Sequence, residues 1–185
     1  MEKVALIIGH NARSKGAFSM IVGSEFSYWK NIAEKVKGEI PELVDIYERK
    51  SSTNYVIEMK EVLKELNKND YKFCLELHFN SSLSLNAKGC ECLVYHKNDK
   101  AKKLAIDLMA RLQTKFKSTV RGNRGLIEVQ DSNTRGGYGI CNSKDTYILI
   151  EPFFGSNIDE ALRFSIVKDV VNFLVEFIKD NIKEW

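Results

Sequence analysis

The stretch VALIIGHN, residues 4–11, is a short apolar run that ends in a glycine, a histidine and an asparagine. Towards the other end of the chain, TYILIE at residues 146–151 is built in a similar way and ends in Glu151. A strand that is apolar on both faces belongs in the middle of a sheet, with helices covering it on either side. We therefore expect both stretches to be inner strands of an α/β fold.

The chain between these two runs alternates between strand and helix patterns. Further apolar runs predict strands at 43–47 and 73–79, with weaker candidates at 92–96 and 126–129. Apolar residues at helical spacing predict helices at 25–37, 55–67, 100–116 and 158–182, and Asn157 with Glu160 fits a capping pair for the last of them. This alternation predicts a three-layer α/β sandwich with a twisted, mostly parallel sheet and helices on both faces. The glycine-rich, polar stretch 119–148 is long for a connection, which is typical of a functional loop.

The composition limits the classes of function that need to be considered. The chain has 185 residues, of which 28 are basic and 25 acidic, so its net charge is only +3 and nucleic acid is not an expected partner. No apolar run approaches the roughly 18 residues that a membrane span needs, so we expect no membrane insertion. The run VALII is too short for a signal peptide, and we expect the chain to be made in the cytoplasm. Nothing in the sequence indicates the oligomeric state.

Three polar residues stand at the ends of predicted strands. His10 follows the first strand, His78 lies near the end of the strand at 73–79, and Glu151 ends the last. In open α/β sheets, ligands bind outside the carboxyl ends of the strands. A single histidine in such a position is more often a satisfied polar residue than a ligand. Because three strands show the same feature, we expect these side chains to meet at one edge of the sheet.

Glu25 is a fourth candidate because of its position on the helix predicted at 25–37. Trp29, Ile32 and Val36 follow it at four, seven and eleven residues, so Glu25 lies on the apolar stripe of the helix. An inward carboxylate needs a partner, and a cation would provide one. The alternative is that Glu25 only occupies the first turn, where acidic residues suit the helix dipole and Ser24 caps the end.

Two histidines and a carboxylate form a known ligand set for catalytic zinc, which keeps a fourth position open for water. The separations along the chain match no local zinc motif, so spacing alone supports the metal only weakly. The remaining histidine, His96, fits the surface end of a strand. The four cysteines are too few and too irregular for a disulfide framework, so we expect reduced thiols. Cys90 and Cys92 share a strand face but have no further thiols near them in the sequence to complete a metal site.

Four segments together carry a resemblance to a known family: GHN at 9–11, EFSYWKN at 25–31, ELHFNSS at 76–82 and ILIEPFFGSN at 148–157. In this order and at these separations they resemble the zinc-dependent N-acetylmuramoyl-L-alanine amidases of the type 3 family, which includes many phage endolysins. The resemblance covers essentially the whole chain. It implies one Zn²⁺ per chain held by His10, Glu25 and His78, with Glu151 as the catalytic carboxylate. It also implies a mixed, six-stranded sheet.

The resemblance further implies a substrate and a place of action. The family cleaves the amide bond between N-acetylmuramic acid and L-alanine in bacterial peptidoglycan, so the expected partner is the cell wall, reached after release from the cytoplasm. We expect residues 1–185 to be a single catalytic domain without a wall-binding domain. In RGNRGL, Arg124 is a candidate substrate contact, while Asn11 and Asn80 are candidates for contacting substrate or orienting the metal ligands. Many family members have an aspartate and a proline near residues 6–8, where this chain has Leu, Ile and Ile, but neither is a ligand.

Two other functions remain open at this point. A zinc carboxypeptidase, or an amidohydrolase acting on small acylated amino acids, would keep the metal and use Arg121, Arg124 or Arg135 to bind a free carboxylate. A non-catalytic cell-wall-binding module would keep the fold without the reaction. The presence of Glu151 beside the three proposed ligands speaks against such a module.

Overall fold

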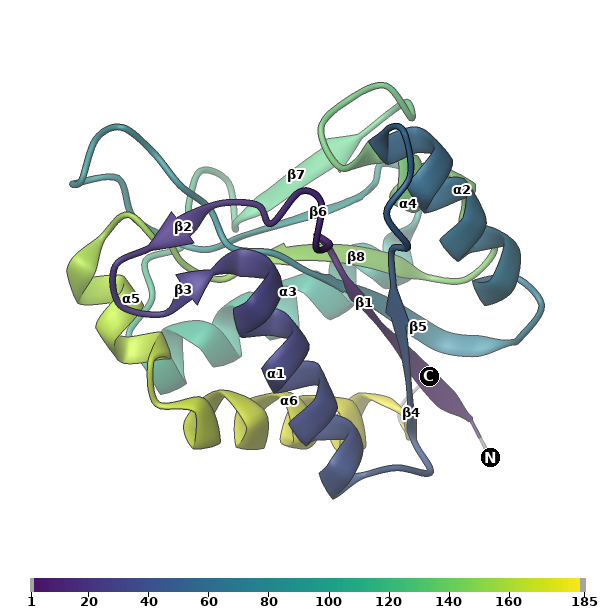
Figure 1. The fold of residues 1–185 in the computed structure, drawn as a ribbon. Helices are drawn as coiled ribbons and strands as arrows, with labels where there is room; N and C mark the ends of the chain where they lie inside the picture. Colours follow the sequence, from purple (N-terminus) through teal and green to yellow (C-terminus); the bar gives the residue numbers. More distant parts are fainter. Residues whose placement is uncertain (1, 184–185) are drawn as a thin grey trace.

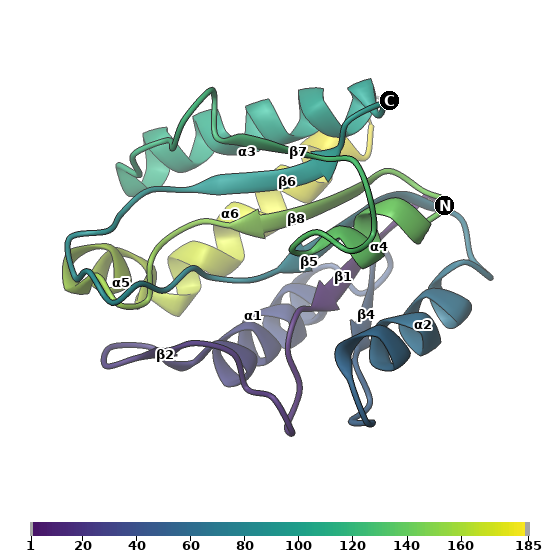
Figure 2. The same cartoon turned by 90° about the horizontal axis from the view of Figure 1, so that it is seen from above.

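The computed structural model describes residues 2–183, within which six strands form one mixed sheet. The strands are β1 (Lys3–Ile8), β4 (Val44–Glu48), β5 (Tyr71–Leu77), β6 (Glu91–Tyr95), β7 (Leu126–Val129) and β8 (Tyr147–Glu151). Their order across the sheet is β4-β1-β5-β8-β6-β7, and Figure 2 shows them side by side in this sequence. Every neighbouring pair is parallel except β6 with β8. The strands at 4–8 and 146–150 are therefore inner strands, as expected.

Helices cover both faces of this sheet, which confirms the three-layer sandwich (Figure 1). One face packs against α1 (Glu25–Glu39), α3 (Asp99–Phe116), α5 (Ile158–Phe164) and α6 (Val167–Asn181). The other face packs against α2 (Tyr55–Leu66) and α4 (Gly137–Asn142). The burial of β1 explains why its sequence is apolar without alternation, because residues 4–8 are at most 1% exposed and contribute to both cores.

The structure corrects the prediction of one helix over 158–182. The chain forms two helices there, because α5 ends at Phe164 and Ile166, with ψ near 84°, interrupts the helical backbone before α6 begins. Phe164 stacks between the rings of Phe116 and Phe153 at this turn. The start of the helical region at residue 158 was predicted correctly, since the Asn157 side chain caps α5 by accepting a hydrogen bond from the backbone N–H of Glu160.

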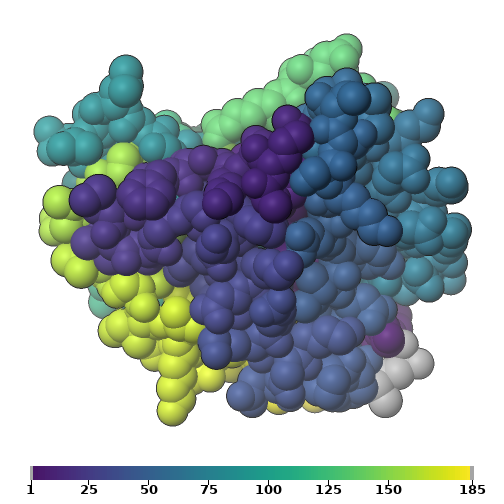
Figure 3. Space-filling view, in the orientation of Figure 1, coloured from purple at the N-terminus to yellow at the C-terminus, as the bar shows by residue number. Residues whose placement is uncertain are grey.

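The sequence also gave no sign of the shortest elements. The hairpin of β2 (Phe18–Ser19) and β3 (Gly23–Ser24) precedes α1, and α4 lies inside the stretch 119–148 that was expected to be a loop. In Figure 3 the hairpin, in purple, lies beside the teal segment that follows β5 and the yellow-green α5. Among the described residues, no helix combines the length and the apolar character that crossing a bilayer requires.

Candidate metal centre and active site

The residues predicted at strand ends are brought to one edge of the sheet. β1, β5 and β8 are parallel neighbours, so His10, His78 and Glu151 all lie at their carboxyl ends. Glu25, the first residue of α1, reaches the same place from the helical layer. Ser24 caps that helix by accepting the backbone N–H of Ser27, so Glu25 is both a first-turn residue and an inward-facing one.

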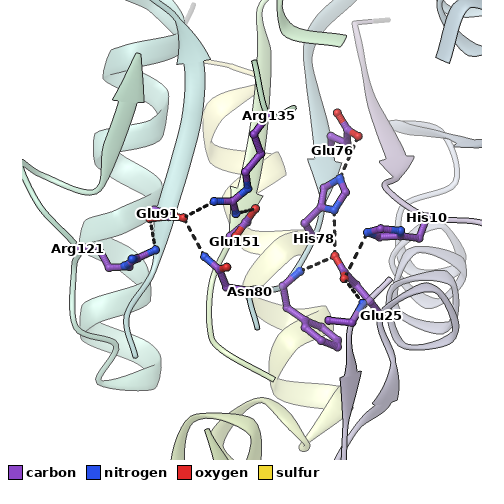
Figure 4. Close-up of polar contacts among 11 residues, drawn as sticks. His10, Glu25, Glu76, His78, Asn80, Glu91, Arg121, Arg135 and Glu151 are labelled. Atoms are coloured by element: carbon purple, nitrogen blue, oxygen red, sulfur yellow. Dashed lines mark hydrogen bonds and ion pairs between the residues drawn. The ribbon is translucent and has the colours of Figure 1, made fainter. Parts of the chain in front are cut away.

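Glu25 contacts both imidazoles from one side (Figure 4). Its Oε1 is 2.9 Å from Nδ1 of His78, and its Oε2 is 3.4 Å from Nε2 of His10. The backbone N–H groups of Ala17 and Phe79 donate to the same two oxygens, at 2.9 and 3.0 Å. The carboxylate is only 3% exposed, and these contacts fix its orientation. Ligand atoms of the three residues all lie within 4.8 Å of one another.

The electrostatics of this group favour a cation. Burial opposes ionisation of Glu25, but the contacts with His10 and His78 outweigh it and hold the pKa of Glu25 well below its ordinary value. Burial also opposes the charge of His78, yet contacts with Glu25 and Glu76 raise the pKa of His78 to about 10. The carboxylates around His78 therefore favour positive charge at this point. A divalent cation at the same point would supply that positive charge instead.

Two glycines allow the backbone to approach the three side chains. A Cβ atom on Gly9 would overlap the imidazole of His78. Gly16 has a positive φ of 74°, and a Cβ there would lie 2.5 Å from Oε2 of Glu25 and 2.6 Å from Cδ2 of His10. The loop between β1 and the hairpin therefore closes against the site only because these positions carry no side chain.

The donor set fits zinc. Four-coordinate zinc with nitrogen and oxygen ligands at about 2.0–2.2 Å requires ligand atoms about 3.3–3.5 Å apart. The separation of His10 Nε2 from Oε2 of Glu25 is 3.4 Å, and that of His78 Nδ1 from the other oxygen, Oε1, is 2.9 Å. The group is therefore compact enough for small side-chain movements to bring the three ligands around one ion. The second ring nitrogen of His10 lies 3.1 Å from the carbonyl oxygen of Ser14, which leaves Nε2 facing the group. Three protein ligands leave a fourth position for water or substrate.

Glu151 borders the same pocket, which has a volume of about 290 Å³. Burial raises the pKa of Glu151, while the positive charge of Arg135 partly offsets that effect. Arg135 donates to Oε1 of Glu151, and the buried Oε2 has no hydrogen-bond partner among residues 2–183. A carboxylate with a raised pKa and one free oxygen is suited to accept a proton.

A second carboxylate holds the other polar residues of the pocket. Glu91, at the start of β6, accepts a hydrogen bond from Nδ2 of Asn80 at 2.8 Å and contacts the guanidinium groups of Arg121 at 2.5 Å and Arg135 at 3.4 Å. The candidate Asn80 thus lines the pocket and is anchored there. Of the other residues near the site, Arg135 was named from the sequence only as a carboxylate-binding residue of the carboxypeptidase alternative, and Glu91, Glu76 and Tyr55 were not named. Only Glu76 had a visible signal, two residues before His78 and therefore on the same face of the strand.

The two remaining candidates, Asn11 and Arg124, are not among the residues that line the pocket. Asn11 is fully buried, and its side chain accepts the backbone N–H of Ser14, the residue whose carbonyl contacts His10. It therefore holds the loop that orients His10. Arg124 is exposed and does not belong to the residues that line the pocket. His96 contacts the carbonyl of Val129, apart from this group, and the four cysteines are free thiols.

Comparison with known proteins gives a consistent result. The sequence matches the Amidase_3 family model, described as N-acetylmuramoyl-L-alanine amidase, over residues 4–171. No curated protein sequence matches the chain. The catalytic domain of CD27L, an endolysin targeting Clostridia difficile, has a TM-score of 0.77 at 24% identity, over 97% of this chain and 98% of that one.

Two further solved structures share the fold. Cwp6 from Clostridium difficile has a TM-score of 0.77 at 21% identity and covers 98% of this chain, which spans only 29% of that protein. The catalytic domain of CwlV, an N-acetylmuramoyl-L-alanine amidase from Bacillus (Paenibacillus) polymyxa var. colistinus, has a TM-score of 0.66 at 18% identity, over 97% and 99% of the two chains. At such identities these likenesses show the fold alone.

Proposed function

The chain belongs to the N-acetylmuramoyl-L-alanine amidase family, and we propose that it acts as a zinc-dependent member in which His10, Glu25 and His78 hold the metal. It is a hydrolase of bacterial peptidoglycan, as the resemblance implied. The proposed bond is the amide between N-acetylmuramic acid and the L-alanine of the stem peptide. One zinc per chain is the expected stoichiometry, because the three ligands form a single group.

The observation that carries the zinc proposal is the surroundings of Glu25. Within residues 2–183 its carboxylate has no lysine or arginine partner, although it is buried and its pKa is lowered. A buried charge is tolerated when it is paired or coordinates a metal. Zinc, when bound, polarises the scissile carbonyl and makes a water molecule acidic near neutral pH.

Glu151 is the proposed proton carrier. Its carboxylate, which lines the pocket, accepts a proton from the attacking water and later returns it to the leaving amine of L-alanine. Burial raises the pKa of Glu151 towards neutral pH, so the carboxylate binds a proton more readily than an exposed glutamate does. Arg135 holds Oε1 and so fixes the orientation of the carboxylate. Asn80 lines the pocket with its Nδ2 held by Glu91, and its amide oxygen is the proposed acceptor for a substrate amide.

The carboxypeptidase alternative is less well supported by the same contacts. It requires a free cation for the substrate carboxylate, but Arg135 is already paired with Glu91 and Glu151, and Arg121 is paired with Glu91. Arg124 lies outside the pocket lining. The amidase reaction needs no such cation, because the scissile amide lies within the glycopeptide.

The test is digestion of purified peptidoglycan with the zinc-loaded chain, with chelator, and with chelator followed by excess zinc. Mass spectrometry of the soluble products identifies the new ends. Free stem peptides that begin with L-alanine, lost with chelator and recovered with zinc, support the proposal. Release of single amino acids from the carboxyl end of the stem would instead identify a carboxypeptidase. Binding to the wall without any soluble product would identify a binding module.

We also propose that residues 1–185 form one catalytic domain, since a single sheet runs through both cores. The likeness to an endolysin catalytic domain supports action on the cell wall. That the chain reaches the wall from the cytoplasm stays a prediction.

A further inference from the structure

Glu76 is a buried carboxylate directly behind the proposed metal ligands. It lies in β5, two residues before His78, and is 0% exposed. Its Oε1 is 3.0 Å from Nε2 of His78, and its Oε2 accepts a hydrogen bond at 2.8 Å from the hydroxyl of Tyr147 in β8. Within residues 2–183, His78 is its ion-pair partner, with no lysine or arginine beside it. Figure 4 shows Glu76 and Glu25 on opposite sides of the His78 ring.

Both ring nitrogens of His78 contact a carboxylate, Nε2 that of Glu76 and Nδ1 that of Glu25 at 2.9 Å. An ionised carboxylate can only accept hydrogen bonds. A metal bound beside Glu25 would take the place of the proton on Nδ1, and Nε2 would keep its proton for Glu76.

His10 shows the same arrangement with the nitrogens exchanged. Its Nδ1 contacts the carbonyl oxygen of Ser14, and its Nε2 faces Glu25. In each ring, one nitrogen therefore faces Glu25 and the proposed metal position, and the other contacts an acceptor on the opposite side of the ring. They differ in the acceptor, because Ser14 offers a neutral carbonyl and Glu76 offers a buried negative charge.

We propose that Glu76 is a positioning residue, which holds the His78 ring with Nδ1 towards the metal and strengthens that nitrogen as a zinc ligand. Tyr147 completes the arrangement by holding the second oxygen of Glu76. The inference rests on the proposed zinc function. A carboxylate behind a metal-bound histidine fixes the ring and raises its basicity, and losing such a partner typically weakens metal affinity about 10–100-fold.

A purely structural role for Glu76 makes a different prediction. In that case the bond to Tyr147 would only join β5 to β8, and substitutions would change the stability of the fold without changing zinc affinity. The test therefore measures zinc affinity and stability separately. Affinity is obtained by competition with a chromophoric chelator, and stability from the melting temperature of the metal-free protein.

Three substitutions separate the contributions at this position. Glu76→Leu removes the acceptor, Glu76→Gln keeps an acceptor oxygen and removes the charge, and Tyr147→Phe removes only the donor to Glu76. The matched control is Glu160→Gln, because Glu160 is also a buried carboxylate and its oxygens accept the backbone N–H groups of Gly89 and Phe154, away from the metal group.

We expect the zinc dissociation constant to rise about 10–100-fold in Glu76→Leu, and by a smaller factor that still exceeds about twofold in Glu76→Gln and Tyr147→Phe, because these keep part of the contact. It should stay within about twofold of the parent in Glu160→Gln. Long-range ¹H–¹⁵N spectra of the zinc-loaded parent should show a proton on Nε2 of His78 that exchanges slowly with water, and this protection should be lost in Glu76→Leu.

The outcomes distinguish this inference from the function on which it rests. If the parent binds zinc tightly and the folded Glu76 and Tyr147 variants bind it within about twofold as well, Glu76 has no positioning role. If Glu76→Leu fails to fold, Glu76→Gln and Tyr147→Phe decide by the same criterion. A parent that binds no zinc would overturn the proposed metal function itself, and the Glu76 inference with it.

Discussion

The carboxylate of Glu151 differs from that of Glu25 in what surrounds it. Glu25 has both oxygens in contact with histidines and backbone N–H groups, whereas Glu151 has one oxygen free. Burial raises the pKa of Glu151, while the contacts of Glu25 lower its pKa. Two carboxylates with pKa values moved in opposite directions suit different tasks, one holding a cation and the other moving a proton.

This difference predicts the behaviour of Glu151→Gln. The substitution removes the proton acceptor and leaves the proposed zinc ligands intact. We expect zinc content and melting temperature close to those of the parent, with peptidoglycan hydrolysis reduced by at least about 100-fold, as is typical when a general base is lost. Elemental analysis and product release measure the two effects. Loss of zinc in this variant, or normal hydrolysis, would show that Glu151 has a different role.

Arg135 gives a prediction about pH. A general base works when ionised, so activity rises as the pH passes upward through the pKa of Glu151. Arg135 lowers that pKa against the effect of burial, and removing its charge should raise the pKa further. The acidic limb of the kcat/KM profile should therefore move to higher pH in Arg135→Ala and stay close to the parent's in Arg135→Lys. An acidic limb in Arg135→Ala that is unmoved, or moved to lower pH, would contradict the assignment of Glu151 as the base.

The contrast between Glu25 and Arg135 explains which residues could be predicted from the sequence. Glu25 stands on a helix whose apolar stripe defines an inward face, so its direction follows from spacing. Arg135 comes from an irregular segment before α4, and Glu91 meets it only because β6 runs antiparallel beside β8. Contacts of this kind depend on tertiary structure and have no local pattern.

At the scale of elements, the loop that leads from β1 to the hairpin determines whether the ligands can meet. Gly16 and Gly23 both have positive φ, at 74° and 82°. A Cβ on Gly16 would contact Glu25 and His10, whereas a Cβ on Gly23 would meet nothing within 4 Å. Both positions therefore need a residue that tolerates a positive φ, but only at Gly16 would a side chain collide with its neighbours.

We expect Gly16→Ala and Gly23→Ala each to lower stability by about 1–2 kcal/mol through the backbone conformation. Only Gly16→Ala should also weaken zinc binding, because its methyl group displaces two of the three ligands. Denaturant unfolding of the metal-free variants and zinc competition measure the two effects. Equal zinc affinity in both variants would mean that the loop can move away from the ligands without cost to the site.

The limits of sequence prediction at this scale follow from periodicity. Ala161, Phe164, Val170 and Val171 are all buried and continue one apolar pattern, so the pattern did not reveal the break at 165–166. No glycine or proline marks that break. Strands as short as β2 and β3, with two residues each, contain no periodicity to detect. The longer strands were found because burial on both faces makes their sequences apolar throughout.

At the scale of the molecule, topology converts distant sequence positions into one site. His10, Glu25 and His78 meet for two reasons. β1 and β5 are adjacent and parallel, and α1 packs against the sheet face that these two strands share. The three-layer class was predictable from alternation of elements, and the edge where the ligands meet followed from strand ends. The position of each strand in the sheet did not follow from pattern alone, because pairing partners are chosen by long-range packing.

Because the three proposed ligands meet only in the folded chain, zinc should stabilise the whole fold. A ligand that binds only the native state adds about 1.4 kcal/mol to the free energy of unfolding for each tenfold rise in free zinc above its dissociation constant. We expect denaturant unfolding in zinc buffers to show this dependence for the parent. Glu25→Gln removes the charge that holds the ion, so its unfolding free energy should be nearly independent of zinc.

The matched control for that variant is Glu34→Gln, because Glu34 lies on the same helix and is exposed. It should keep the zinc dependence of the parent. If Glu25 only complements the helix dipole, Glu25→Gln costs about 0.3–1 kcal/mol and leaves the zinc dependence unchanged. Parallel zinc dependence in the parent and in Glu25→Gln would then assign Glu25 to the helix start and require another third ligand. If the unfolding free energy is independent of zinc in Glu25→Gln but not in Glu34→Gln, the stabilisation by zinc depends on Glu25 as a ligand.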